Sequence, residues 1–131
     1  MIVLDTHAWI WFLAEPTRLS RRARRAVEAA AGRGQVFVSS ISVWEVVLLA
    51  RRGRLALKMA VEEWIAHAEG LPFLSFVPVD NRVAMRSVGL PAALGPDPAD
   101  RMIAATAAIL GAALVTKDER LHGVAGIATI W

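Results

Sequence analysis

The chain has 131 residues and no cysteine, so one domain spanning residues 1–131 is expected, and disulfides and thiolate metal sites are excluded. Hydrophobic residues make up 56% of the chain, yet its longest uncharged run, residues 102–116, is shorter than the roughly 20 residues that cross a bilayer. The net charge of +3 suits a polyanionic partner. The first apolar run has no basic residue before it, unlike a signal peptide. We therefore expect a cytoplasmic protein, free of the membrane, with apolar contact surfaces.

The first strand and helix are predicted at the very start of the chain. Residues 2–5 form an apolar run that ends in an aspartate, which is typical of a central parallel strand whose last residue reaches the sheet edge. A helix is expected over residues 6–13. Its aromatic residues are interpreted as core or interface residues in preference to a platform for base stacking, and they are Trp9, Trp11 and Phe12.

A second helix is expected after Ser20, which can cap it, through Ala31. Five arginines gather at its start, at positions 18, 21, 22, 24 and 25. Cations at a helix N-terminus oppose the helix dipole, so local stability does not explain them. Two interpretations stay open, a solvated surface or contact with an RNA backbone, and the candidates for that contact are Arg21, Arg22 and Arg25.

The middle of the chain continues the alternation of strand and helix. A strand is expected over residues 35–38, and residues 42–45 (Ser-Val-Trp-Glu) have the spacing of a capping box, in which Glu45 would hold a helix start. A further amphipathic helix is expected over residues 58–69 and a strand over residues 73–79.

The last third of the chain holds its longest apolar segment. Asp80 is expected to cap one helix, and Asp97, followed by proline, the next. Gly111 ends that second helix, a buried strand is expected over residues 112–115, and residues 126–131 are expected to form a last strand. This order predicts an α/β fold with a central parallel sheet, helices on both faces and the first strand in the middle.

Four acids occupy equivalent places in this scheme, at a strand end or an early helical position: Asp5, Glu45, Asp100 and Asp118. Helix N-termini and strand C-termini share one sheet edge, so the four are expected to converge. Two unit charges 4 Å apart repel by about 4 kcal/mol at an effective dielectric of 20, so such a cluster needs protons or a cation. Hard oxygen donors without cysteine favour Mg²⁺ or Mn²⁺. Each acid alone fits a helix cap or a surface position, and their convergence favours the metal site.

A divalent ion in such a cluster can activate water against a phosphodiester and stabilise the leaving oxygen. The hydroxyls of Thr6 and Thr116 are candidates for orienting ligands or water. Other small α/β classes fit less well. A phosphoacceptor receiver domain needs an acidic pair after the first strand and an acceptor aspartate after the third, and a haloacid-dehalogenase-type phosphatase needs an aspartate where His7 stands.

Four segments resemble the PIN-domain ribonucleases in order and spacing, in particular the VapC-type toxins of toxin–antitoxin modules: residues 1–7, 42–45, 97–107 and 115–118. The likeness covers nearly the whole chain. It implies an α/β/α sandwich and a Mg²⁺- or Mn²⁺-dependent endoribonuclease acting on tRNA, rRNA or mRNA. It also implies homodimers, and inhibition by a cognate antitoxin whose tail enters the active-site groove.

The resemblance also implies roles for single residues. Asp5 and Asp100 would be the principal metal ligands, Glu45 the third acid, and Asp118 the fourth, acting through water or on a second ion. Many relatives have a His-Arg pair just before the acid that matches Asp97, where this chain has Gly-Pro, so a loop contribution to substrate binding is not carried over. One alternative stays open, a catalytically silent PIN-like module that binds RNA or protein, because sequence identifies ligands but not turnover.

Overall fold

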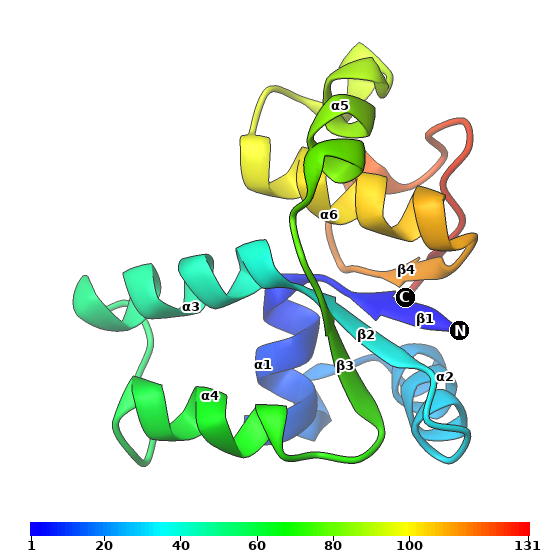
Figure 1. The fold of residues 1–131 in the computed structure, drawn as a ribbon. Coiled ribbons are helices and arrows are strands. Elements are labelled where there is room, and N and C mark those ends of the chain that lie inside the picture. The colour runs from blue at the N-terminus through cyan, green and yellow to red at the C-terminus, as the bar shows by residue number, and fades with distance from the viewer.

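A computed structural model describes residues 1–131 and contains one five-stranded parallel sheet, ordered β3-β2-β1-β4-β5 (Figure 1). The strands are β1 (Ile2–Leu4), β2 (Val36–Ser39), β3 (Leu74–Val77), β4 (Ala113–Val115) and β5 (Thr129–Ile130). The most apolar early run therefore forms the central strand, as predicted.

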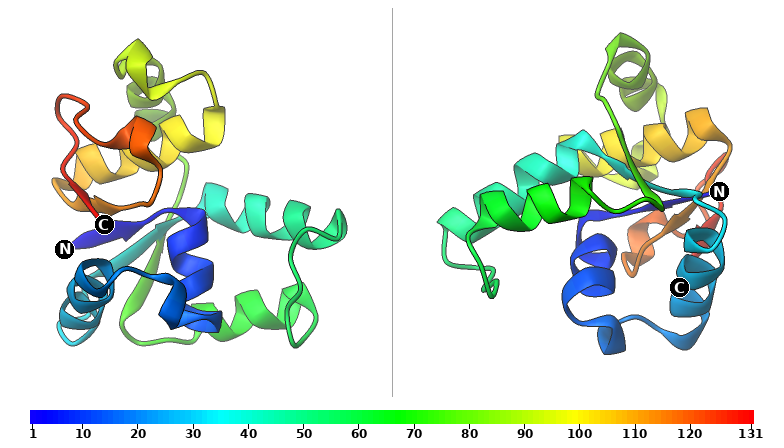
Figure 2. Two further views of the ribbon diagram at one scale, coloured as in Figure 1. Left: turned by 180° about the vertical axis from the view of Figure 1, so that it is seen from behind. Right: turned by 60° about the horizontal axis from the view of Figure 1, so that its bottom comes forward.

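Six α-helices surround the sheet: α1 (Thr6–Ala14), α2 (Arg21–Ala31), α3 (Ser40–Arg51), α4 (Val61–Glu69), α5 (Asn81–Gly89) and α6 (Pro98–Leu110). Short 3₁₀ turns cover Pro16–Arg18, Ala92–Leu94 and Glu119–Leu121. The first two helices lie on one face of the sheet, and α6 lies on the other with α5 packed against it (Figures 1 and 2). The prediction of a three-layer α/β/α sandwich is confirmed.

Alternating residues of β1 divide the core into two apolar clusters. Ile2 and Leu4 belong to the cluster under α1 and α2, whereas Val3 belongs to the cluster under α6. Trp9 is fully buried in the first cluster, 4.8 Å from Trp64 between ring centroids. Because both faces of β1 are covered, the strand is apolar throughout, which is the pattern expected of a central parallel strand.

Some elements are shorter than the sequence pattern predicts. Helix α4 begins at Val61 and not at position 58, and Glu62 and Glu63 lie in its first turn. Acids in the first turn interact favourably with the helix dipole, whereas Lys58 there would oppose it. The last strand covers only Thr129–Ile130, because it is an edge strand whose single partner, β4, is itself short.

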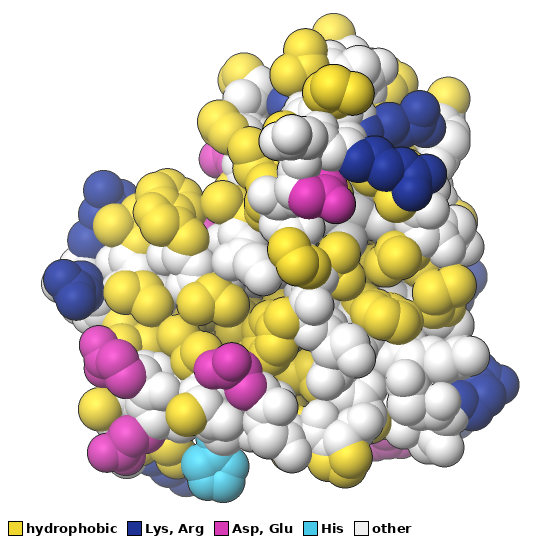
Figure 3. Space-filling view, viewed as in Figure 1, with side chains coloured by type: hydrophobic (Ala, Val, Ile, Leu, Met, Phe, Trp, Pro, Cys, Tyr) yellow, Lys and Arg dark blue, Asp and Glu magenta, His cyan; other side chains and the backbone are white.

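Several large apolar side chains are exposed, and none of the helices combines the length and the apolar character that crossing a bilayer requires. Met85 and Val88 on α5 are 74% and 81% exposed, and Trp44 on α3 is 58% exposed. Figure 3 shows apolar side chains gathered over α5 and along the α3–α4 side of the molecule. Surfaces of this kind mark contact sites for other proteins.

Candidate active site

The four acids singled out in the sequence line one pocket of about 230 Å³ at the carboxyl edge of the sheet. Asp5 follows β1, Glu45 lies on α3, Asp100 lies in the first turn of α6, and Asp118 follows β4. Six other residues complete the wall: Thr6, His7, Trp11, Ile103, Lys117 and Arg120. The topology thus brings together acids from four separate segments, as predicted.

Asp5 follows β1 directly and is also the N-cap of α1. Its Oδ1 accepts a hydrogen bond from the backbone N–H of Ala8 at 2.8 Å. Burial raises the pKa of this carboxyl, and hydrogen bonds from Thr116 and Ala8 oppose the rise. Capping and ligation therefore do not exclude each other here, since the cap uses one carboxylate oxygen.

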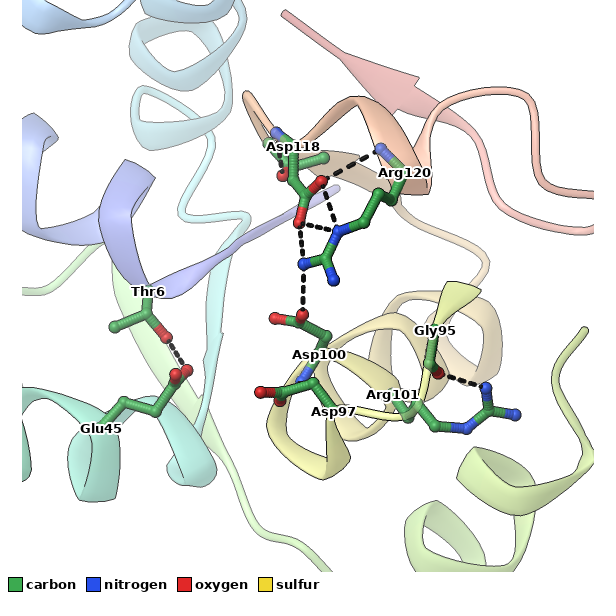
Figure 4. Close-up of polar contacts among 9 residues, drawn as sticks. Thr6, Glu45, Gly95, Asp97, Asp100, Arg101, Asp118 and Arg120 are labelled. Carbon is green, nitrogen blue, oxygen red and sulfur yellow. Dashed lines mark hydrogen bonds and ion pairs between the residues drawn. The ribbon is translucent and has the colours of Figure 1, made fainter. Parts of the chain in front are cut away.

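Glu45 is held by a side chain from another helix and not by a capping box. The cap of α3 is Ser39, whose Oγ accepts from the N–H of Ile41, so Ser42 and Glu45 both lie inside the helix. The Thr6 hydroxyl donates to Glu45 Oε1 at 2.5 Å (Figure 4). The same hydroxyl lies 2.9 Å from the Ser42 Oγ. The capping-box interpretation is wrong, because the helix begins two residues before Ser42. Burial raises the pKa of Glu45.

Asp100 is positioned by the cap of its own helix. The carboxylate of Asp97 accepts from the N–H of Asp100 at 3.0 Å, which confirms the predicted cap. The pKa of Asp100 is raised to about 6, first by burial and then by the nearby negative charge of Asp97, against the attraction of Arg120. Negative charge at this end of α6 is therefore in excess.

Arg120 joins two of the acids, and the sequence analysis missed it. Its Nη2 lies 2.9 Å from Asp100 Oδ2 and 2.6 Å from Asp118 Oδ2 (Figure 4). This contact lowers the pKa of Asp118. The buried Thr116 hydroxyl accepts from the N–H of Asp118 at 3.0 Å and fixes the same turn. The sequence signal that could have indicated this contact is the short spacing between Asp118 and Arg120, which lets the two side chains pair within one turn.

The donor set fits a hard divalent cation, although no three of these side chains lie close enough together to share one ion in this arrangement. Carboxylate oxygens are the ligands that Mg²⁺ and Mn²⁺ prefer. Three of the four acids have a raised pKa, and each of the three is affected by the charge of another pocket acid. Burial is the largest cause of each rise. Of the two cations on the pocket wall, Lys117 and Arg120, only Arg120 is paired with the acids.

The arginines considered for RNA contact lie elsewhere. Arg21, Arg22 and Arg25 are exposed on α2 and are not part of the pocket wall. Their helix is capped by Ser20, whose Oγ accepts from the N–H of Ala23 at 3.0 Å, as predicted. Contact of these arginines with RNA stays a prediction.

Comparison with known proteins gives the family. The model of the PIN domain matches residues 2–127, nearly the whole chain. The protein belongs to the PIN-domain family. It is 39% identical over 133 aligned residues to Ribonuclease VapC22 of Mycobacterium tuberculosis, an alignment that covers 99% of this chain and 98% of that relative. The predicted resemblance to VapC-type PIN domains is confirmed.

Solved structures share the fold of this PIN domain. A DNA-bound VapBC complex from Salmonella typhimurium has a chain with a TM-score of 0.70 and 23% identity, covering 98% of this chain and 95% of that one. A VapBC2 complex from Rickettsia felis bound to a promoter DNA fragment gives a TM-score of 0.71 at 16% identity, covering 98% and 97%. At these identities the likeness establishes the fold alone.

The loop before Asp97 is held in this PIN domain by an arginine that points away from the pocket. Arg101 follows Asp100 in the chain, yet its Nη1 donates to the carbonyl of Gly95 at 2.9 Å (Figure 4). Gly95 has a φ of +86°, which a side chain would strain. Gly95 and Pro96 therefore form a backbone turn that the side chain of Arg101 holds from the side away from the pocket.

Proposed function

We propose that this protein is a metal-dependent endoribonuclease that acts as the toxin of a toxin–antitoxin pair. One observation carries the proposal: four carboxylates from distant segments line one pocket, and only two cations, Lys117 and Arg120, lie on its wall. The ribonuclease name of the 39% identical relative supports RNA as the substrate. The VapBC complexes among the structural neighbours support an antitoxin partner.

Asp5 and Asp100 are the residues that would mainly hold the Mg²⁺ or Mn²⁺ ion, with Glu45 and Asp118 completing the site. Bound there, the ion supplies Lewis-acid chemistry, which activates water for in-line attack and stabilises charge on the leaving oxygen. Glu45 can take up the proton of the attacking water, because its carboxylate lines the same pocket as Asp5 and Asp100. Thr6 holds that carboxylate in place by its hydrogen bond.

Arg120, which pairs with Asp100 and Asp118, is also placed to stabilise the transition state of cleavage. Its guanidinium is exposed at the mouth of the pocket and is held by Asp118 and Asp100. A phosphodiester in the pocket would bring negative charge to the same place, and a fixed guanidinium there lowers the free energy of the more highly charged transition state. Asp118 thereby serves both as an acid of the metal site and as the anchor of Arg120.

A catalytically silent PIN-like module is the alternative, and the pocket argues against it. Burial disfavours the ionised form of Asp5, Glu45 and Asp100. A module that only binds RNA would gain nothing from three buried acids that repel the phosphate backbone. The acids become useful once a cation joins them.

The remaining partner predictions belong to the same proposal. A homodimer and an antitoxin would cover apolar surface such as Met85, Val88 and Trp44. The cytoplasm is the proposed location because cellular RNA is the proposed substrate. Arg21, Arg22 and Arg25 would contact the RNA backbone through their exposed guanidinium groups.

The direct test uses the purified chain freed of antitoxin. We expect it to cleave RNA internally with Mg²⁺ or Mn²⁺, to stop when EDTA is added, and to recover when Mn²⁺ is restored, because the acids cannot work without their cation. Labelled RNA fragments on a denaturing gel give the readout. Cleavage that continues in EDTA would contradict the role of the metal, and an inert chain in both ions would favour the silent module.

Thr6→Val tests the positioning of Glu45. The substitution keeps the shape of a side chain that is 3% exposed but removes the hydrogen bond to Glu45. We expect cleavage to slow by about 10- to 100-fold, as for other groups that orient metal ligands. Thr106→Val on α6 is the control, since Thr106 is also buried and its hydroxyl also makes a hydrogen bond, to the carbonyl of Met102, but it is not part of the pocket wall. Equal rates for Thr6→Val and the unsubstituted chain would show that Glu45 needs no such support.

A further inference from the structure

Trp11 packs against the first core cluster, as expected, and it also lines the acidic pocket. Its ring is only partly buried, and two cations lie over it: Arg18 Cζ at 4.7 Å and Lys117 Nζ at 5.9 Å from the ring centroid. The interpretation of the α1 aromatic residues as core or interface residues holds, with Trp9 fully buried and Trp11 packed both against the core and on the pocket wall.

The orientation of Trp11 is fixed by neighbouring rings. His7, one helical turn earlier on α1, lies 5.6 Å away between centroids, and Trp131 at the chain end lies 5.9 Å away. The indole is thus in contact with rings from two separate segments, and it stays only partly buried on the pocket wall. A fixed ring binds a planar partner at low cost in side-chain entropy.

The two cations near Trp11 have little compensating charge. Lys117 is exposed and makes no ion pair, and Arg18 meets Glu15 only at 3.7 Å, with both side chains more than half exposed. Exposed pairs of this kind contribute little to stability. Both cations lie over the Trp11 ring, and neither is held in a close ion pair, so their charge stays available to a ligand.

We propose that Trp11, Lys117 and Arg18 form a nucleotide-binding subsite for single-stranded RNA, an inference that rests on the proposed endoribonuclease function. A base stacks on the indole in place of one cation, and the flanking phosphates bind Lys117 and Arg18. Aromatic rings with adjacent cations are the usual means of binding single strands without sequence preference. Since Lys117 precedes Asp118, the bound nucleotide lies directly beside the phosphate to be cleaved.

An acidic peptide is the competing occupant, and the geometry favours RNA. The pocket acids repel a carboxylate-rich segment and RNA phosphates alike, so they do not separate the two, but a carboxylate-rich segment would use the cations and not the indole. A nucleotide uses the ring and the cations together. The role of the ring is therefore the feature to test.

The test measures binding of a labelled single-stranded RNA to the Asp100→Asn chain in EDTA, where cleavage does not interfere. Trp11→Leu is expected to bind about 5- to 150-fold more weakly, the loss of one stacked base, whereas Trp11→Phe retains most of the affinity. A series of RNAs, each lacking the base at a different single position, identifies the stacked base. Removing that base should lower the affinity of the parent but should not lower the affinity of Trp11→Leu any further. Melting temperatures verify that both variants are folded.

The cations are tested through salt dependence. Arg18→Gln and Lys117→Gln should each flatten the slope of log affinity against log salt by about 0.7, one phosphate contact each. Arg33→Gln is the matched control, because Arg33 is exposed in the turn before β2, at the opposite sheet edge. The triple change of Arg21, Arg22 and Arg25 to Ala, in the same assay, decides between RNA contact and a solvated surface for α2.

The outcomes separate the two proposals. If the unsubstituted chain cleaves RNA but Trp11→Leu binds as the parent does, the subsite is overturned and the endoribonuclease stands. If the chain never cleaves RNA but binding falls in Trp11→Leu, the endoribonuclease fails and an RNA-binding subsite remains. A parent that binds no RNA overturns the subsite, as does a Trp11→Phe variant that loses as much affinity as Trp11→Leu.

Discussion

Asp100→Asn is expected to reduce RNA cleavage by on the order of 10²- to 10³-fold or more while making the metal-free protein more stable. The loss of activity follows because Asp100 is one of the two principal ligands proposed for the cation. Asparagine keeps the size of the side chain and one oxygen donor but loses the charge. Initial cleavage rates at saturating Mn²⁺ measure the effect.

The gain in stability follows from the pKa of Asp100, which is raised from 3.8 to about 6 in the folded protein. Between these two values the folded chain binds more protons than the unfolded chain, so the free energy of unfolding falls as pH rises. Above about pH 6 the unfavourable contribution of the charged side chain is fully present. Asparagine removes that contribution, so urea unfolding in EDTA should show a smaller loss between pH 4 and pH 7 for Asp100→Asn.

Asp97→Asn is the matched control for this substitution. Asparagine caps helices as well as aspartate does, so the bond to the Asp100 N–H is kept while a neighbouring charge is lost. We expect cleavage within about tenfold of the unsubstituted chain, since Asp97 is not part of the pocket wall. Full activity in Asp100→Asn, or equal losses in both variants, would remove the ligand role of Asp100.

The convergence of the acids could be predicted because it depends on general rules. The apolar residues 2–4 indicate a central strand, and in a parallel sheet every strand end and the next helix start lie at one edge. Asp5, Asp100 and Asp118 are placed by that rule alone. Glu45 was also correctly expected in this pocket, but its interpretation as part of a capping box was wrong. The Ser-x-x-Glu spacing occurs inside a helix as well as at its start, so spacing alone could not place the start of α3.

The parts that could not be predicted depend on side-chain directions across distant segments. Arg120 reaches Asp100, and Thr6 reaches Glu45, across separations of 20 and 39 residues. Hydrophobic periodicity describes one element at a time and contains no such information. Trp11 is the same case: it packs against the first core cluster, but its place on the pocket wall and its contact with Trp131 join segments far apart in the chain.

Arg101→Met is expected to lower the free energy of unfolding by about 2–4 kcal/mol. The guanidinium of Arg101 donates to backbone carbonyls at the end of α5 and in the loop that follows, namely those of Ser87, Val88, Leu90, Pro91 and Gly95. The shortest of these bonds, 2.6 Å, is to Leu90. Methionine fills similar space but donates nothing, and each carbonyl that stays buried without a donor costs about 1–3 kcal/mol. Equilibrium unfolding in urea measures the change.

Two further variants separate the contribution of the guanidinium hydrogen bonds of Arg101 from that of its charge and from the general effect of replacing an arginine. Arg101→Lys keeps the charge but replaces five donors in a plane by a point charge, so only part of the stability should return. Arg86→Met changes an exposed arginine of α5 that makes no hydrogen bond or ion pair, so it should alter stability by less than about 0.5 kcal/mol. If Arg101→Met behaved like Arg86→Met, water would be satisfying the carbonyls.

Loss of Arg101 should also affect the pocket, although the side chain points away from it. The loop it holds ends at Asp97, whose carboxylate fixes the N–H of Asp100. A looser loop would let the first turn of α6 fray, and the carboxylate of Asp100 would lose its position relative to Asp5. We therefore expect Arg101→Met to weaken Mn²⁺ binding at temperatures well below its melting point, whereas Arg86→Met leaves Mn²⁺ binding unchanged. The adjacent residues Asp100 and Arg101 would then serve the same site, Asp100 by binding the cation and Arg101 by holding the loop before Asp97 in place.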